Sequence, residues 1–251
     1  MIRLADVRKA FGDKVVLAGL SLDVADGMNT VIIGGSGSGK SVTLKLIVGL
    51  LEPDAGLIEV DGLSVPDLGR EELAELRSHI GYVFQFAALF DSMTVAENIR
   101  LGLAKRGLDE TTIRKRIEDS LETVELSGQE DRYPAELSGG MRKRVGIARA
   151  VALAPRYILY DEPTTGLDPV TSAVMDRLMQ RTRDLGVTGV VVTHDMRSAF
   201  TVGDRIAMLY DGVIRQVGTA AEIQATTDPI VRQFIEGRPD DVEPPARRSA
   251  S

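Results

Sequence analysis

The period of apolar and polar positions changes along the chain, and its first third predicts mainly strands. Residues 1–33 alternate apolar and polar side chains between turn sequences, a pattern typical of antiparallel strands. Residues 34–85 contain a glycine-rich loop, a helix, a pair of strands and a final strand that ends at Gln85. The turns between these strands are marked by Gly12, Gly27, Gly56 and Gly62.

The rest of the chain predicts a helical stretch, followed by strands that alternate with helices. Residues 86–153 have mostly helical periodicity, whereas residues 154–225 return to short, continuous apolar runs typical of buried strands. The helical runs fall at 94–106, 111–126 and 139–153. The predicted strands of the last stretch fall at 157–160, 190–193 and 206–210.

The glycine-rich loop lies between a buried strand and a helix. Residues 34–41 read Gly-Gly-Ser-Gly-Ser-Gly-Lys-Ser, after the apolar run 30–33 and before the apolar segment 42–48. In this context the motif predicts a phosphate-binding loop, because glycines let backbone N–H groups wrap a phosphate and the helix N-terminus adds positive charge. Lys40 is expected to reach the β- and γ-phosphates of a nucleotide, and Ser41 to ligate Mg²⁺. The predicted nucleotide-binding residues here are Gly35, Ser36, Gly37, Ser38, Gly39, Lys40, Ser41 and Val42.

Two carboxylates follow the apolar run 157–160. Ligands bind at the carboxyl ends of strands in open α/β sheets, which is where Asp161 and Glu162 would lie. Asp161 is predicted to hold Mg²⁺, and Glu162 to polarise the attacking water as a general base. An isolated Asp-Glu pair is usually a helix cap or a solvated pair. The sequence Thr-Thr-Gly-Leu-Asp-Pro at 164–169 favours the catalytic interpretation instead.

A histidine follows the next predicted strand. His194 comes directly after 190–193, and an imidazole at the end of a core strand can donate to a γ-phosphate oxygen. The alternative is a structural or surface histidine, but the position after a core strand favours the functional interpretation. The residues expected to act in hydrolysis are Glu162, His194 and Lys40.

Composition narrows the class of protein. The 251 residues, 43% of them hydrophobic, allow one large domain or a core with a subdomain, and the absence of Cys excludes disulfide and thiolate chemistry. The net charge of −7 disfavours nucleic acid as a partner. No apolar run approaches the roughly 18 residues that a membrane span needs, and the start of the chain lacks a signal-peptide pattern.

Residues 137–141 read Leu-Ser-Gly-Gly-Met, and with the motifs above they make residues 1–235 similar to ABC transporter ATP-binding subunits. The resemblance implies an α/β fold for residues 1–236: a RecA-like phosphate-loop core, an antiparallel β subdomain and an α-helical subdomain. The implied parts are the core at 1–85 and 154–225, the helical subdomain at 86–153 and C-terminal helices at 219–236. Residues 237–251 contain three Pro and little that could pack, which predicts an extended or disordered tail.

The resemblance implies ATP hydrolysis with ATP and Mg²⁺, and it adds four kinds of site residue. Phe11 matches the aromatic position that stacks on adenine, with plain core packing as its alternative. Gln85 matches the glutamine that links the Mg²⁺ site to the membrane partner and contacts the metal. Asp168 matches the loop that crosses the dimer interface. The signature residues that cap the γ-phosphate of a second copy, in a head-to-tail homodimer, are Ser138, Gly139 and Gly140.

Two positions depart from the common pattern of this family. Val42 stands where a second hydroxyl often follows the Mg²⁺ ligand, so only its backbone N–H remains for the α-phosphate. Met141 replaces a common Gln after the signature glycines, which puts a polar contact to the nucleotide sugar in doubt. Neither departure touches the residues expected to act in hydrolysis.

Four aromatic residues fall between 82 and 90, which indicates either a groove for a partner helix or packing within the subdomain. The segment Ala-Leu-Phe-Asp-Ser-Met-Thr-Val at 88–95 is similar to Mla/Mce-type lipid transporter ATPases, as are 137–145, 192–196 and 232–240. The resemblance implies a peripheral subunit on the cytoplasmic face of the inner membrane. Its implied partners are two permease subunits and a periplasmic or membrane-anchored Mce-domain substrate-binding protein, and its cargo is phospholipid or another hydrophobic molecule.

Two alternatives remain open on the sequence. One is the ATPase of another ABC importer, for instance for amino acids. The other is a non-transport ABC protein of DNA repair or translation. Proteins of that second class carry long coiled-coil insertions or two cassettes, and this chain shows one cassette without such an insertion.

Overall fold

The computed structural model describes residues 1–238, except for the side chain of Lys105, and it contains two sheets. The larger sheet has the strand order β10-β9-β3-β8-β7-β6. Five of its strands run parallel, and only β10 pairs antiparallel, with β9. Its strands are β3 (Asn29–Ile33), β6 (Ile80–Val83), β7 (Tyr157–Asp161), β8 (Thr188–Thr193), β9 (Arg205–Tyr210) and β10 (Val213–Gly218).

The smaller sheet is antiparallel, with the order β2-β1-β4-β5. Its long strands alternate buried and exposed side chains along much of their length, as a sheet with one solvated face requires. It confirms the antiparallel strands predicted for the N-terminal stretch. Its strands are β1 (Ile2–Phe11), β2 (Lys14–Val24), β4 (Ala55–Val60) and β5 (Leu63–Ser64).

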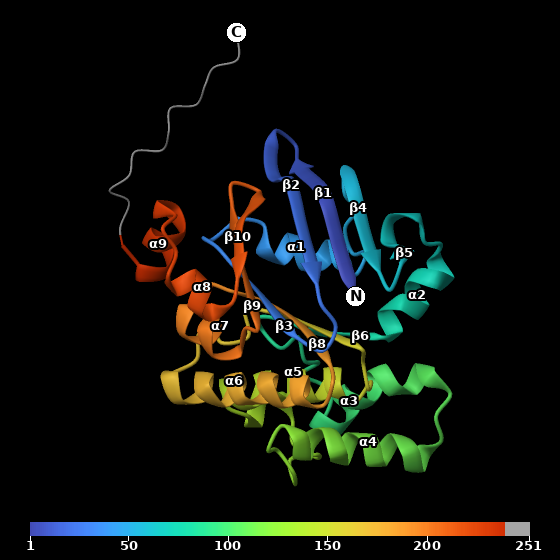
Figure 1. Ribbon diagram of the computed structural model, residues 1–251. Coiled ribbons are helices and arrows are strands. Elements are labelled where there is room, and N and C mark those ends of the chain that lie inside the picture. The colour runs from blue at the N-terminus through green and yellow to red at the C-terminus, as the bar shows by residue number, and fades with distance from the viewer. Residues whose placement is uncertain (239–251) are drawn as a thin grey trace.

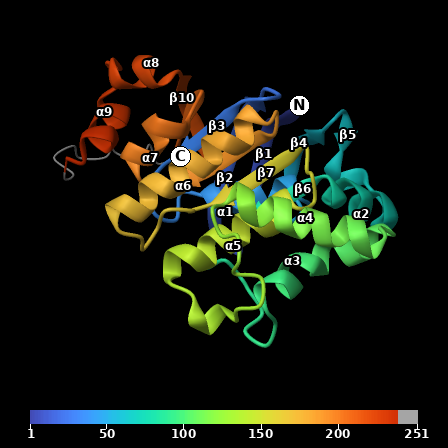
Figure 2. The ribbon, with the colours of Figure 1, turned by 90° about the horizontal axis from the view of Figure 1, so that it is seen from below.

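The helices form separate layers around these sheets (Figure 1). Helix α1 (Lys40–Ile47) lies between the two sheets, and α2 (Arg70–Ser78) follows β5. Figure 2 shows α3 and α4 on one side of the molecule and α8 and α9 on the other. The remaining helices are α3 (Val95–Leu103), α4 (Glu110–Thr123), α5 (Gly139–Val151), α6 (Pro169–Asp184), α7 (Met196–Val202), α8 (Ala220–Gln224) and α9 (Pro229–Glu236). Short 3₁₀ helices cover Val65–Asp67, Ala104–Arg106 and Pro134–Glu136.

Two hydrophobic cores lie on opposite faces of the six-stranded sheet. Side chains along β3 point alternately to each face, so Ile32 packs with α1 and the antiparallel sheet, while Val31 and Ile33 pack with α3–α6. Every residue of β3, β7 and β8 is buried. The ends of these strands therefore have fixed positions, and the loops that follow them start from a rigid support.

One predicted boundary is wrong. The strand expected to end at Gln85 ends at Val83, which pairs with Tyr160 in the last pair of the β6–β7 ladder. β6 is an edge strand with a single neighbour, so nothing holds the chain extended beyond that ladder. Phe84 and Gln85 lie in the connection to α3 instead.

The helical stretch and the strands predicted at 157–160, 190–193 and 206–210 are confirmed in position. Within residues 1–238, no helix is both long enough and apolar enough to cross a bilayer. From residue 239 on, the predicted tail lies outside the described residues.

Candidate active site

The phosphate-binding loop predicted at 34–41 connects β3 to α1. Gly37 and Gly39 have φ of +76° and +107°, backbone conformations that glycine adopts without strain. Gly39 is the N-cap of α1 and has no side chain to bond the free N–H groups of the first turn. Ser38 Oγ is buried and has no hydrogen-bond partner among the described residues. The loop therefore presents unpaired donors at a helix N-terminus, as an anion site requires.

Lys40 folds back over this loop. Its side chain is only 6% exposed, and Nζ donates to the carbonyl oxygens of Gly34 at 2.9 Å and Gly35 at 3.1 Å. The same ammonium lies 3.4 Å from Glu162 Oε1. A buried cation is thus held at the point where the loop meets the end of β7. The side chain of Val42, the last of the predicted loop residues, packs against the core between the sheets.

Two of the three predicted metal-binding residues meet. Ser41 Oγ donates to Asp161 Oδ1 at 2.6 Å, and Tyr82 OH donates to Asp161 Oδ2 at 3.0 Å. Gln85, the third predicted residue, is half-buried in the loop after β6. Within residues 1–238, no hydrogen bond or ion pair joins Gln85 to Ser41 or Asp161, so its contact with a metal stays a prediction.

Glu162 and His194 are brought together at the ends of adjacent strands. His194 Nδ1 lies 2.8 Å from Glu162 Oε2, and Thr165 Oγ1 donates to the same carboxylate oxygen at 3.0 Å. Glu162 is buried, whereas His194 is exposed. The backbone of Glu162 has a φ of +50°, a left-handed conformation that strains a non-glycine residue. The structure therefore brings Glu162, His194 and Lys40 together, and their role in hydrolysis stays a prediction.

The signature residues lie apart from this cluster, at the start of α5. Ser138 and Gly139 are exposed, and Ser138 Oγ accepts from the backbone N–H of Met141 at 3.2 Å as the helix N-cap. A Cβ at Gly140 would collide with Thr171, so glycine permits close packing of α5 on α6. In the described part of the chain, no hydrogen bond or ion pair links these three residues to the phosphate loop.

Asp168 and Phe11 are the last two of the predicted site residues. The carboxylate of Asp168 accepts from the N–H groups of Val170 at 2.9 Å and Thr171 at 3.0 Å, and so caps α6. Phe11 ends β1, is 47% exposed and belongs to neither hydrophobic core. Its core-packing alternative is therefore wrong, while its contact with adenine stays a prediction.

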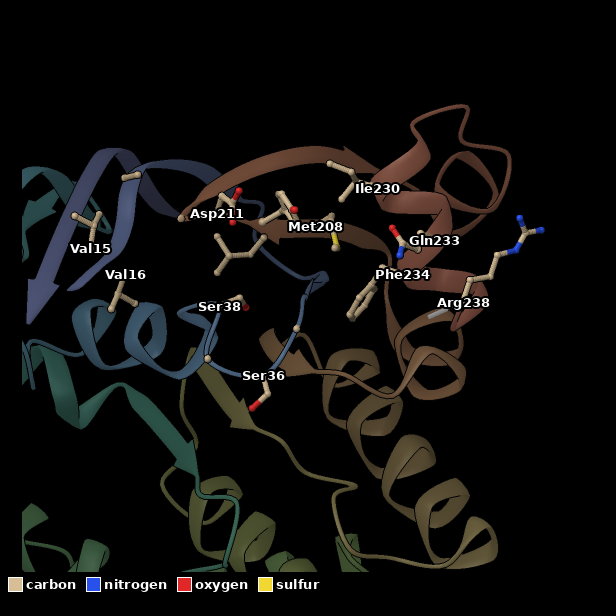
Figure 3. A pocket seen from close by; sticks show the side chains of 16 residues that line it. Val15, Val16, Ser36, Ser38, Met208, Asp211, Ile230, Gln233, Phe234 and Arg238 are labelled. Carbon is tan, nitrogen blue, oxygen red and sulfur yellow. The ribbon is translucent and has the colours of Figure 1, made fainter. Parts of the chain in front are cut away.

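A cavity of about 800 Å³ opens beside the phosphate loop (Figure 3). This volume lies within the range typical of small-molecule sites. Ser36 and Ser38 border it on the loop, and Val16 of β2 lies to one side. Figure 3 shows Phe234 pointing from α9 toward the loop. The contribution of α9 was not predicted, because its residues follow the phosphate loop by about 190 positions in the sequence.

Lys143 is a second buried lysine that the sequence motifs did not single out. Its Nζ donates to the carbonyl oxygens of Pro163 at 3.0 Å and Thr165 at 2.6 Å. Burial lowers the pKa of Lys143, and the Glu162 carboxylate opposes that shift. Lys143 thus ties α5 to the turn after Glu162. Its spacing of three residues from Gly140 and four from Ile147, on one helix face, was the available signal.

Comparison with known proteins identifies the family. A family model described as ABC transporter matches residues 17–165. The probable ribonucleotide transport ATP-binding protein mkl of Mycobacterium leprae is 39% identical over 94% of this chain and 69% of the relative. The chloroplastic protein trigalactosyldiacylglycerol 3 of Arabidopsis thaliana is 40% identical over 96% and 74%. The sulfate/thiosulfate import ATP-binding protein CysA of Thermosynechococcus vestitus is 42% identical over 93% and 69%.

A solved structure has the same fold. The ATP-binding cassette MJ0796, solved as a dimer in a post-hydrolysis state with ADP and Pi, matches with a TM-score of 0.80 and 35% identity. The match covers 88% of this chain and 99% of MJ0796. It confirms the predicted cassette fold with a phosphate-loop core, an antiparallel sheet and a helical subdomain. The chain therefore belongs to the ABC transporter family, as an ATP-binding subunit that hydrolyses ATP.

Proposed function

We propose that this chain binds Mg²⁺·ATP at the phosphate loop and hydrolyses it with Glu162 as the general base. The observation that carries the proposal is the convergence of Glu162 with Lys40, 3.4 Å away, and His194, 2.8 Å away. A carboxylate polarises water from hydrogen-bond distance, and the buried lysine and the loop N–H groups hold the phosphates. His194 is placed to donate to the γ-phosphate from the exposed side of the site.

The oxygen ligands at this site fit magnesium. Ser41 and Asp161 offer a hydroxyl and a carboxylate, the hard ligands that Mg²⁺ prefers. Residues 1–238 hold no cluster of three or more His, Cys, Asp or Glu side chains suited to a metal. The remaining ligands would then be phosphate oxygens and water, as is usual for Mg²⁺ with nucleotides. The bound ion would neutralise charge that develops on the phosphates.

The exposed signature supports a paired arrangement. Ser138 and Gly139 face solvent without a partner in their own phosphate loop, so we propose that they complete the site of a second copy in a head-to-tail homodimer. Phe11 stacks on adenine in this proposal, and Asp168 lies at the interface between the copies. ATP then forms part of the dimer contact, which makes pairing dependent on nucleotide.

Ser138→Arg is expected to prevent ATP-dependent pairing. The longer, charged side chain would occupy the space where the signature approaches the partner's phosphate loop. The comparison is made in the Glu162→Gln protein, whose slowed hydrolysis preserves bound ATP. Light scattering with ATP should show dimers for Glu162→Gln alone and monomers for Glu162→Gln combined with Ser138→Arg. Ser127→Arg, an exposed serine in the same subdomain, is the matched control and should still pair. Equal pairing in both variants would refute the proposal that the signature of one copy completes the nucleotide site of the other.

The loop between β6 and α3 supports a membrane partner. Phe84, Phe86 and Phe90 are 39%, 84% and 55% exposed, and we call them the aromatic loop. Their backbone is held in place from behind, because Asn98 bonds both the N–H and the carbonyl of Phe90, at 2.8 and 3.1 Å. Arg149 donates to the carbonyls of residues 87 and 88, both at 2.7 Å. Exposed aromatic side chains on a backbone that is held in place are typical anchors of an interface.

We propose that the aromatic loop docks on a permease helix, which places the chain peripherally on the cytoplasmic face of the inner membrane. The proposed complex has two permease subunits and a Mce-domain substrate-binding protein, and it moves phospholipid or another hydrophobic molecule. The segment at 88–95 supports this cargo by its likeness to Mla/Mce-type ATPases, as does the glycerolipid in the name of the Arabidopsis relative. The sulfate importer supports a second candidate, a polar anion.

Phe86→Asp is expected to lower the amount of permease that co-purifies with this subunit by at least roughly 10-fold, the scale of losing a buried aromatic anchor. ATP hydrolysis by the isolated subunit should stay near the parent rate, because Phe86 is not among the residues proposed to bind or hydrolyse ATP. Leu185→Asp, at a residue with 66% exposure outside the loop, is the matched control and should co-purify with permease like the parent.

Mass spectrometry of the parent complex identifies its cargo: bound lipid and a Mce-domain protein support the proposal. A soluble sulfate-binding partner without lipid would favour the polar anion.

A further inference from the structure

Tyr82 lies next to the proposed metal site without belonging to any of the motifs. It is on β6, and its register partner on β7 is Leu159. Asp161 follows Leu159 by two residues, so the side chains of Tyr82 and Asp161 project from the same face of the sheet. This register brings the phenol hydroxyl to 3.0 Å from Asp161 Oδ2.

Each oxygen of the Asp161 carboxylate accepts one hydroxyl. Ser41 donates to Oδ1 from the phosphate-loop side, and Tyr82 donates to Oδ2 from β6. Asp161 is buried, so an oxygen that lost its donor would have no bulk water to replace it. The terminal torsion of an aspartate has a broad energy profile, and two donors on opposite oxygens restrict it to one orientation.

The phenol is itself held in place by a neighbouring ring. The Tyr82 ring packs on Phe84, with centroids 4.4 Å apart and planes tilted by 33°. The Tyr82 hydroxyl therefore meets Asp161 from a fixed ring position.

We propose that Tyr82 is a positioning residue for Mg²⁺ binding, which fixes Asp161 in the orientation in which Oδ1 contacts Ser41. This inference rests on the proposed metal site formed by Ser41 and Asp161. A partner that orients a metal ligand from outside the coordination sphere commonly changes metal affinity by about 10-fold to 100-fold. The Tyr82 hydroxyl meets that description, since it contacts the ligand and not the phosphate loop.

Tyr82→Phe tests the inference, because it removes the hydroxyl and keeps the ring on Phe84. Mn²⁺ serves as the probe, and its binding to the ADP-saturated protein is measured by electron paramagnetic resonance. The Kd for Mn²⁺ should rise by about 10-fold. Affinity for ATP in excess EDTA should stay unchanged, and so should kcat at saturating Mg²⁺, while the Mg²⁺ concentration for half-maximal rate increases. An unchanged Kd for Mn²⁺ would overturn the proposal.

Two further variants separate the possible failures. Tyr160→Phe removes another buried tyrosine hydroxyl, one that bonds Thr182 at 2.8 Å on the opposite face of β7. It should lower Tm without changing the Kd for Mn²⁺, and an equal rise in Kd would mean that Tyr82→Phe acts only through general loosening. Asp161→Asn should weaken Mn²⁺ binding strongly. If Asp161→Asn binds Mn²⁺ like the parent, the proposed metal site itself is wrong; if only Tyr82→Phe does, the positioning role alone fails.

Discussion

Glu162→Gln is expected to lower the rate of ATP hydrolysis by roughly 10²-fold to 10⁴-fold while leaving ATP binding intact. Glutamine has nearly the shape of glutamate but cannot accept a proton from water. The hydrogen bond from Thr165 reaches Oε2, an atom that an amide oxygen can replace, so the turn should keep its conformation. Steady-state release of phosphate and equilibrium binding of a fluorescent ATP analogue measure the two effects separately.

The control for this variant is Glu122→Gln, which removes an exposed charge on α4 far from the strand ends. It should hydrolyse ATP at the parent rate. The slowed Glu162→Gln subunit should also remain paired for longer in ATP, since the nucleotide at the interface persists. Hydrolysis at the parent rate in Glu162→Gln would show that another group activates the water.

The convergence of the site could be predicted from the sequence because it follows from topology. The apolar runs before Gly34, Asp161 and His194 are too short for helices and were therefore predicted as strands. In the structure they form β3, β7 and β8. These strands are parallel neighbours in the sheet, so the residues that follow them meet at one edge. No packing detail is needed for that argument.

Other features depend on packing that the sequence does not display. Tyr82 reaches Asp161 only because of the register between β6 and β7, and Lys143 reaches the turn after Glu162 only because α5 packs beside it. The sequence does not distinguish whether the aromatic residues at 84, 86 and 90 are buried or exposed, and only the structure shows that they are exposed. The end of β6 was misplaced at Gln85 because the apolar residues continue past the point where the ladder stops.

The turn from Glu162 to Asp168 connects the proposed hydrolytic residue to the signature helix α5 within one subunit. Glu162 is proposed to act in this copy's own site, whereas the signature on α5 is proposed to serve the partner's site. Lys143 joins α5 to the turn through the carbonyl oxygens of Pro163 and Thr165, at 3.0 and 2.6 Å. A displacement of the turn after Glu162 should therefore be transmitted to α5, and a displacement of α5 to the turn. This contact offers a physical basis for communication between the two proposed nucleotide sites.

Lys40→Ala is expected to weaken ATP binding by about 10-fold to 100-fold, the scale of losing a hydrogen bond to a charged group. It should also lower hydrolysis by at least roughly 10²-fold, because a preorganised donor to the developing phosphate charge is lost. The ammonium is 6% exposed and lies 3.4 Å from Glu162, so no solvent cation takes its place with the same geometry. Glu162 would also lose its ion pair with Lys40. Isothermal titration with ATP and steady-state release of phosphate measure the two losses.

The matched control is Lys45→Ala, an exposed lysine on the same helix whose removal changes the net charge equally. It should bind and hydrolyse ATP like the parent, which would separate the role of position from that of charge. A thermal melt of both variants checks that α1 keeps its place between the sheets. If Lys40→Ala retains the parent's affinity and turnover while Lys45→Ala behaves the same, the loop at 34–41 does not hold the phosphates, and the assignment of the nucleotide site is wrong.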